Sequence, residues 1–353
     1  MSRTRLYLDH AATTPLLPAA REAMADALAR WHNPSSPHAE GRAARAALEQ
    51  ARARIAAALG WQGPILFTSG ASEALTIALQ RGCGGERIIS AVEHDSLLRA
   101  APEARRLPVG PDGLVDLANL AAIAGEQPLV AVQHANNETG VLQPLEQVAE
   151  AVRAAGGILL ADCAQTAGKL PLPDADMIAL SAHKFGGPPG AGALLLRDWS
   201  LIAPVGGQEQ GYRYGTENLP AILGMAAALE ACEPWIDRAA ALRARLEEAI
   251  AAAGGTCVAA GSARIPTIGA YRMPGVAAAA QLIEFDMAGI AVSAGSACSS
   301  GSVKPSHVLA AMGWEEPALS EVIRVSFGPA TDEADIDRFT ALWARLAARR
   351  RAA

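Results

Sequence analysis

The first two thirds of the chain alternate short apolar runs with longer stretches in which apolar residues recur at helical spacing. Such short runs, rich in Ile, Leu and Val and bounded by turn residues, are typical of buried β-strands. We expect strands at residues 65–68, 87–90, 129–133, 157–161 and 177–180. Between two of them, residues 144–155 form an amphipathic helix pattern. This alternation predicts an α/β fold with a mostly parallel sheet covered by helices.

The pattern changes after residue 234, where a long Arg/Glu/Ala helix begins at about residues 235–253. The short strands and further helices that follow predict a smaller α+β domain at the C-terminal end of the chain. We expect these strands at 267–271, 291–293 and 322–327, and these helices at 277–288 and 332–348. The expected division is a large domain at 14–234 and a small domain made of 1–13 and 235–353.

Composition excludes several classes of protein. The chain has 353 residues, which is room for about two domains, and 51% of them are hydrophobic, so a folded core is expected. A net charge of -6 and a pI near 5.7 disfavour binding to a nucleic-acid backbone. The sequence holds no uncharged apolar run of about 18 residues, so we expect no membrane span.

The five cysteines are scattered and form no CxxC pair. This set disfavours a disulfide framework and a zinc site and favours a reducing compartment, so we expect a cytoplasmic protein. Cys298 differs from the others because it lies in a run of small residues, 293–302, that offers no apolar packing and belongs to a loop expected at about residues 293–304. We interpret it as an exposed nucleophile or sulfur carrier. The others are expected to be structural: Cys83, Cys163, Cys232 and Cys257.

Polar residues follow the predicted strands where each strand ends. They are Ser69 and Ser72, Glu93 and His94, Asn136 to Glu138, Asp162 and Gln165, and Ser181, His183 and Lys184. In open α/β sheets, ligands bind at the carboxyl ends of the strands. The sequence therefore predicts one pocket that gathers these side chains.

Lys184 and Asp162 together indicate a carbonyl cofactor. A desolvated lysine at a strand end can form a Schiff base with pyridoxal phosphate (PLP), although a single such lysine is more often an ordinary surface residue. Asp162 ends the preceding strand and could pair with a pyridinium nitrogen, whereas alone it would suggest a turn cap. Gln165 could donate to the ring oxygen.

A glycine turn at residues 68–73 leads from a strand into a helix, which suits a phosphate group. Ser72 can add a hydroxyl, but the turn matches neither a GxGxxG motif nor a P-loop. His94 could stack on a planar cofactor and exchange protons, although a lone histidine is more often structural.

In chain order these motifs resemble the cysteine desulfurases, PLP enzymes of the class V aminotransferase family with the fold of type I PLP-dependent transferases. The similarity extends from Leu8 to about Ile336. It is carried by residues 8–15, 33–36 with 38, 68–73, 93–94, 136–138, 162, 165, 181–184, 213, 215–216 and 295–298. The stretch 298–324 resembles the branch that acts in nitrogen fixation and iron–sulfur cluster assembly.

The resemblance implies conversion of L-cysteine to L-alanine, with the sulfur carried as a persulfide on Cys298 to a scaffold or another acceptor protein. Lys184, Cys298 and His94 would be catalytic. The implied PLP contacts are Ala71, Ser72, His94, Asn137, Asp162, Gln165, Ser181, His183, Lys184 and Thr216. The implied substrate contacts are Arg324, Asn33 and Asn137.

The resemblance also implies a homodimer, because Thr216 would reach the phosphate in the partner subunit. It implies no resident metal, with Cys298 as the residue that could contact a nascent iron–sulfur cluster. Three positions depart from the family pattern without removing a catalytic role: His32, Thr76 and Pro329.

Other interpretations share part of this evidence. A selenocysteine lyase or a class V aminotransferase would use the same PLP site, although an aminotransferase has no need of Cys298. A catalytically idle scaffold or regulator is disfavoured by the presence of Lys184, Asp162 and Cys298. A nucleotide-binding module lacks the glycine spacing and the acidic ribose contact.

Overall fold

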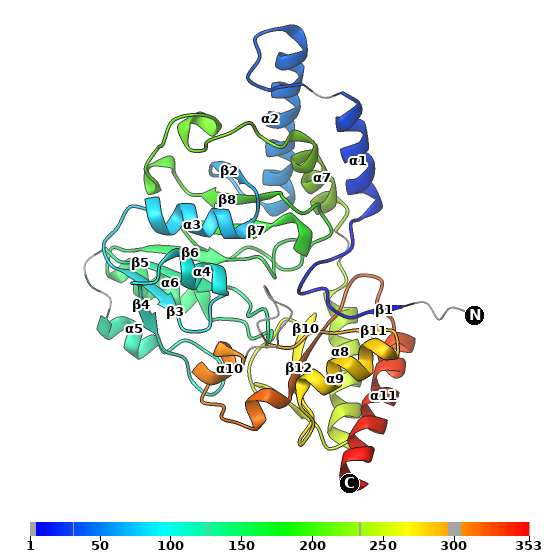
Figure 1. Ribbon diagram of the computed structural model, residues 1–353. Coiled ribbons are helices and arrows are strands. Elements are labelled where there is room, and N and C mark those ends of the chain that lie inside the picture. The colour runs from blue at the N-terminus through cyan, green and yellow to red at the C-terminus, as the bar shows by residue number, and fades with distance from the viewer. Residues whose placement is uncertain are drawn as a thin grey trace.

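The computed structural model describes residues 5–30, 32–123, 125, 127–232, 234–295 and 305–352, and Cys298 falls outside these ranges. A seven-stranded sheet lies at its centre, in the order β2-β8-β7-β6-β5-β3-β4 (Figure 1). Only β8 runs against its neighbours β2 and β7, so the predicted mostly parallel sheet is confirmed. The strands are β2 (Ile65–Thr68), β3 (Arg87–Ser90), β4 (Arg105–Leu107), β5 (Leu129–Gln133), β6 (Ile158–Asp162), β7 (Met177–Ser181) and β8 (Gly192–Leu196).

Helices cover both faces of this sheet because its central strands are apolar on both sides. In β5, Val130 and Val132 pack into one core, while Leu129 and Ala131 pack into a second core on the opposite face. The first core includes residues of α1 (Pro18–Ala29), α2 (Ala39–Leu59), α5 (Leu117–Ile123), α6 (Leu145–Ala154) and α7 (Leu219–Glu230). The second includes residues of α3 (Ala71–Arg81) and α4 (Asp95–Ala100).

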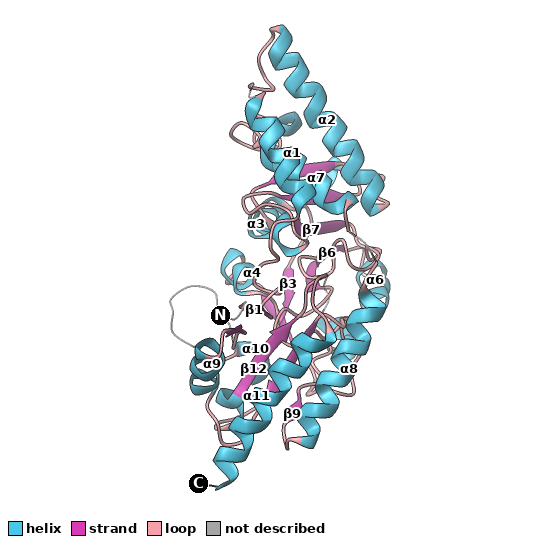
Figure 2. Cartoon of the chain, turned by 90° about the vertical axis from the view of Figure 1, so that its right-hand side faces the viewer, coloured by secondary structure: helices cyan, strands magenta, loops and turns pink. Residues whose placement is uncertain are grey.

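Local sequence accounts for two of these helices. α6 buries the four apolar residues of its amphipathic pattern, as expected. α2 begins after His38, whose imidazole accepts a hydrogen bond from the Gly41 N–H, and ends at Gly60, where φ is +65°. Glycine adopts this left-handed conformation at little cost. Figure 2 shows α1, α2 and α7 together at one end of the molecule.

The C-terminal part has its own core, to which the N-terminal strand also contributes. The rings of Phe285 and Phe339 stack there with centroids 4.7 Å apart, next to Trp343. An antiparallel sheet has the order β12-β10-β9, and β1 pairs in parallel with β11. These elements are β1 (Leu6–Tyr7), α8 (Ile236–Ala252), β9 (Thr256–Cys257), β10 (Ile268–Arg272), α9 (Ala278–Met287), β11 (Ile290–Ala291), α10 (His307–Ala311), β12 (Val322–Ser326) and α11 (Glu333–Ala352). The exact domain boundaries stay a prediction.

One expected strand is wrong in its bounds. The strand expected at 291–293 is only Ile290–Ala291, and Ser293 instead exchanges backbone hydrogen bonds with Arg324 of β12. Strands β1, β4 and β9 were not anticipated, since they have two or three residues and lack a long apolar run. Of the helices in the described part of the chain, none is long and apolar enough to cross a membrane.

Candidate active site

A cavity of about 440 Å³ opens at the carboxyl ends of the central strands. Nine of the ten implied PLP contacts line it: Ala71, Ser72, His94, Asn137, Asp162, Gln165, Ser181, His183 and Lys184. They come from separate segments, which meet because the carboxyl ends of parallel strands lie at the same edge of the sheet. The topology thus gathers these side chains, and their individual roles stay predictions.

Lys184 ends a short 3-10 turn, η1 (Ala182–Lys184), directly after β7. Its ammonium donates to the backbone carbonyls of Ala11, at 2.6 Å, and Ala12, at 2.9 Å. The hydroxyl of Thr14 donates to the Lys184 carbonyl, so the N-terminal segment holds both the backbone and the amine of this lysine. Sequence reasoning missed Ala11 and Ala12 because they act through their backbone and not their side chains.

Asp162 ends β6, the neighbour of the strand that precedes Lys184, and its side chain is buried. Its Oδ1 accepts a hydrogen bond of 2.9 Å from the Ala164 N–H. Burial raises the pKa of Asp162 to about 6, an effect that this hydrogen bond and the charge of Lys184 partly offset. A buried carboxylate in this position gains from a cationic partner such as a protonated ring nitrogen.

Gln165 is also buried, and only one of the two polar atoms of its side-chain amide has a hydrogen-bond partner among the described residues. Its Nε2 donates to the Ala11 carbonyl at 3.0 Å, whereas its Oε1 has no hydrogen-bond partner among the described residues. Buried polar atoms of folded proteins are rarely left in this state, so the atom is available to a polar group of a ligand. Together with the acidic Asp162, it makes the cavity suitable for a polar heteroaromatic ring.

The glycine turn after β2 is shaped for close backbone approach. Gly70 has φ +154° and precedes α3, whose N-terminus has no side-chain cap. A Cβ added to Gly192 of β8 would lie 2.5 Å from the Gly70 Cα, so the turn and β8 can pack this closely only because Gly192 has no side chain. The turn carries Ala71 and Ser72 at the N-terminus of a helix of 11 residues, a position that favours an anion.

Two histidines line the cavity in the neutral form. His94 precedes α4, and its Nδ1 accepts a hydrogen bond from the Ser96 N–H at 3.2 Å. Burial, aided by the charge of Lys184, lowers the pKa of His94 to about 4, and the same two causes lower the pKa of His183 to about 4. At neutral pH the His94 imidazole is therefore uncharged, which suits stacking on a planar ring.

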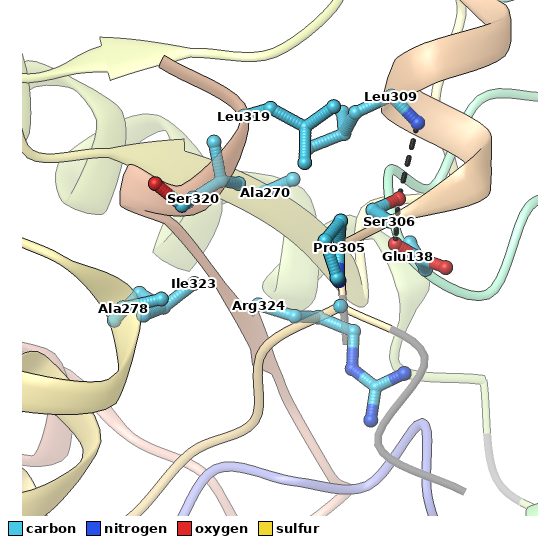
Figure 3. Close-up of a pocket in the computed structure, with 12 residues that line it drawn as sticks. Glu138, Ala270, Ala278, Pro305, Ser306, Leu309, Leu319, Ser320, Ile323 and Arg324 are labelled. Carbon is cyan, nitrogen blue, oxygen red and sulfur yellow. Dashed lines mark hydrogen bonds between the residues drawn. The ribbon is translucent and has the colours of Figure 1, made fainter. Parts of the chain in front are cut away.

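Arg324 lies beside the main cavity and not in its lining. Its Nη1 donates to the Asn137 carbonyl at 2.9 Å, and its Nη2 donates to Asp9 Oδ1 at 2.8 Å. Arg324 also lines a smaller cavity of about 70 Å³ together with Ser306 and Glu138, and Figure 3 shows its guanidinium pointing away from those two residues. Asn137 also lines the main cavity, so it links Arg324 to that site.

Two of the expected residues do not line either cavity of this chain. Asn33 and Thr216 are both exposed, on the α1–α2 and β8–α7 connections respectively. Cys298, expected to be catalytic, lies outside the described residues. Glu93, expected among the side chains of the pocket, does not line the cavity: its carboxyl is fully buried and accepts a hydrogen bond from the Gln133 N–H at 2.9 Å.

Comparison with known proteins identifies the family. A model described as aminotransferase class-V matches residues 6–339. The chain belongs to the class-V aminotransferase family. A cysteine desulfurase of Cereibacter sphaeroides is 38% identical over 95% of this chain and 93% of its own length. One from Klebsiella pneumoniae is also 38% identical, over 94% of this chain and 90% of its own length.

Solved structures agree with this assignment. The X-ray structure of a NifS-like protein from Rickettsia africae covers 97% of this chain and 99% of its own, with a TM-score of 0.89 and 31% identity. A structure described as SspA in complex with cysteine covers 93% of this chain and 100% of its own, with a TM-score of 0.79 and 29% identity. The family resemblance and the type of fold expected from the sequence are both confirmed.

Proposed function

We propose that this chain is a PLP-dependent cysteine desulfurase that converts L-cysteine to L-alanine and passes the sulfur to an acceptor protein. The observation that carries the proposal is the set of groups around one cavity: the amine of Lys184, the buried carboxyl of Asp162 and the uncapped N-terminus of α3. The full-length relatives named as cysteine desulfurases support the choice of this reaction over other reactions of the family.

The residues that would hold PLP follow from their chemistry and from the family resemblance. Asp162 would pair with the ring nitrogen, and His94 would stack on the ring. Gln165 and Asn137 would reach the ring oxygen, and Gln165 would do so by moving its Nε2 from the Ala11 carbonyl to donate to that oxygen. The phosphate would be held by Ala71, Ser72, Ser181 and His183, and by Thr216 of the partner subunit in a homodimer. When bound, PLP supplies a ring that withdraws electrons from the substrate.

The side chains of the chain itself have separate tasks. Lys184 would bond the cofactor carbonyl and then move a proton at the substrate Cα, because its amine reaches the cavity from a fixed backbone position. Arg324 would bind the substrate carboxylate through a bidentate pair. Because Asp9 accepts a hydrogen bond from Arg324 Nη2, the incoming carboxylate must share or replace this contact.

Sulfur transfer is assigned to Cys298. Its thiolate would attack the sulfur of the activated substrate, so that the S–S bond of a persulfide forms while the Cβ–S bond of the substrate breaks. The electron pair of the broken bond stays with the carbon skeleton, which takes up a proton at Cβ and leaves as alanine. The acceptor would be an iron–sulfur scaffold or another sulfur-accepting protein, in the cytoplasm.

Two measurements test this function. Borohydride reduction followed by peptide mapping should place the PLP label on Lys184, and a label on another lysine would refute the site. Cys298→Ser should keep the PLP absorbance and its change on addition of L-cysteine, yet release almost no alanine or sulfide. Alanine release by this variant near the wild-type rate would instead favour the lyase or aminotransferase alternative.

A further inference from the structure

A buried ion pair outside the cavity ties the β8–α7 connection to β2. Glu209, which is 2% exposed, accepts hydrogen bonds from Arg52 Nη1 at 2.9 Å and Nη2 at 2.8 Å. Its Oε2 also accepts from the Phe67 N–H at 3.0 Å. Arg52, on α2, donates in addition to the Ile65 carbonyl, and its guanidinium lies 4.4 Å from the centre of the Phe67 ring.

This ion pair binds to the unpaired backbone edge of the sheet. β2 is an edge strand that pairs only with β8, so alternate backbone groups of β2 face away from the sheet. The Arg52–Glu209 pair takes up two of these groups, at Ile65 and Phe67. A bidentate, buried pair of this kind fixes both distance and orientation, which a single exposed ion pair does not.

The segment held in this way, residues 203–218, is folded upon itself. Glu209 and Gln210 have φ values of +51° and +57°, a conformation that non-glycine residues adopt only when the surroundings hold them there. The Gln208 N–H donates to the Arg213 carbonyl at 2.7 Å, and the Tyr214 hydroxyl donates to the Val205 carbonyl at 2.8 Å. Fixing Glu209 therefore fixes the segment as far as Tyr214.

The end of this segment lies outside the lining of its own chain's cavity, and Arg213 Nε lies 3.7 Å from Oε1 of Glu73, which is part of that lining. Thr216 is exposed and does not line the cavity, and Tyr214 beside it is 70% exposed. Glu217 is buried, yet neither of its carboxylate oxygens has a hydrogen-bond partner in the described part of the chain. The nearest cation is Arg45, with Nη1 4.0 Å away. A segment that is rigidly held, exposed at its tip and short of partners is suited to contact with a second subunit.

We propose that Glu209 and Arg52 are positioning residues that hold segment 203–218 so that Thr216 reaches the cofactor phosphate bound in the partner subunit. The inference rests on the shared sites of the proposed homodimer. It assigns the ion pair a role in trans, since the pair serves the cavity of the other protomer.

The first test compares two substitutions that remove the same charge. Glu209→Gln keeps an oxygen for the Phe67 N–H but loses the bidentate pair with Arg52. Its matched control is Glu230→Gln, because Glu230 also pairs with an arginine of α2, Arg54, but in an exposed contact away from the segment. We expect Glu209→Gln to raise the Kd of PLP about tenfold, the scale of one charge-assisted hydrogen bond, and Glu230→Gln to leave it unchanged.

Heterodimers separate this role from a general loss of stability. In each, one protomer carries Lys184→Ala, so that only the other protomer can bond PLP, and the rate of PLP loss to a scavenger is followed by absorbance. When Glu209→Gln is in the same protomer as Lys184→Ala, the altered segment faces the intact lysine, and PLP loss should be about tenfold faster. When the two substitutions are in different protomers, the intact lysine faces an unaltered segment, and PLP loss should match that of the heterodimer with Lys184→Ala alone.

The reverse pattern would overturn the inference, because it would mean that Glu209 acts on the glycine turn of its own chain. Equal rates in both heterodimers would overturn it as well. Sedimentation of the wild-type protein reports separately on the dimer. A fully active monomer would refute the shared site itself, whereas a dimer with equal rates would refute only the role of the ion pair.

Discussion

The charge of Asp162 lowers the stability of the cofactor-free protein by an amount that can be measured. Burial raises the pKa of this carboxyl from 3.8 to about 6, which means that the folded protein holds its charged form less readily than the unfolded chain does. At about 1.4 kcal/mol for each pKa unit, the ionised group costs the folded state about 3 kcal/mol. Asp162→Asn removes the charge and keeps an oxygen for the Ala164 N–H. We therefore expect the cofactor-free variant to be more stable than the wild type.

The sign of the pH dependence follows from the raised pKa. Above about pH 6 the carboxyl is ionised in both states, and the wild type bears the full cost. As the pH falls towards 3.8 the folded wild type takes up a proton that the unfolded chain does not yet bind, so the cost disappears. The advantage of Asp162→Asn should therefore be about 3 kcal/mol at pH 7.5 and close to zero at pH 4.

Urea denaturation of the PLP-free proteins at several pH values checks this expectation, with the midpoint as the observable. Asp174→Asn is the matched control, because Arg153 and Arg197 hold the pKa of this exposed carboxyl below its usual value. Asp174→Asn should lower the free energy of unfolding slightly at pH 7.5, by about 1 kcal/mol or less. A wild type that is more stable than Asp162→Asn at pH 7.5, or an advantage that does not vary with pH, would refute the reasoning.

Three further predictions concern neighbouring residues. Gly192→Ala should lower the free energy of unfolding by about 1–3 kcal/mol and weaken PLP binding, because its Cβ would meet the backbone of Gly70 and Leu180. Thermal unfolding checks this, with Gly261→Ala as the control because a Cβ there meets nothing within 4 Å. Equal melting points of the two variants would contradict the prediction. Glu93→Gln should change stability by less than about 1 kcal/mol at pH 7, since burial raises the pKa of Glu93 well above its usual value and so disfavours its charged form; a large loss in urea denaturation would mean that the charge of Glu93 stabilises the fold. Lys184→Ala should leave PLP bound without a covalent link and slow alanine release by several orders of magnitude, and turnover near the wild-type rate would exclude this lysine.

Much of the fold was predictable because its signals are local. The central strands are continuous apolar runs, and α6 has a clear apolar face, so both were found from periodicity alone. Strand β4 was not, because Arg105 and Arg106 make it polar and it owes its place to pairing with β3. Short pairings of this kind depend on tertiary contacts and have no sequence signature.

The candidate site was likewise predictable only in part. Polar side chains at strand ends, such as Asp162 and His94, could be found because the topology of a parallel sheet determines where they meet. The carbonyls of Ala11 and Ala12 could not, since any residue carries a carbonyl and only the fold brings these two to Lys184. Backbone contacts across more than 170 residues lie beyond what local patterns reveal.

The effect of PLP on Asp162→Asn follows from the same carboxyl. In the cofactor-free protein the charge of Asp162 is a cost, but a protonated ring nitrogen would turn it into a favourable partner, and the amide of asparagine cannot replace it. A ligand stabilises the folded state in proportion to its affinity, so PLP should raise the urea midpoint of the wild type much more than that of the variant. The order of the two midpoints at pH 7.5 should then reverse on addition of PLP, from variant above wild type to wild type above variant. If PLP raised both midpoints equally, Asp162 would not be the partner of the ring, and its burial would have to be explained by the packing of β6 alone.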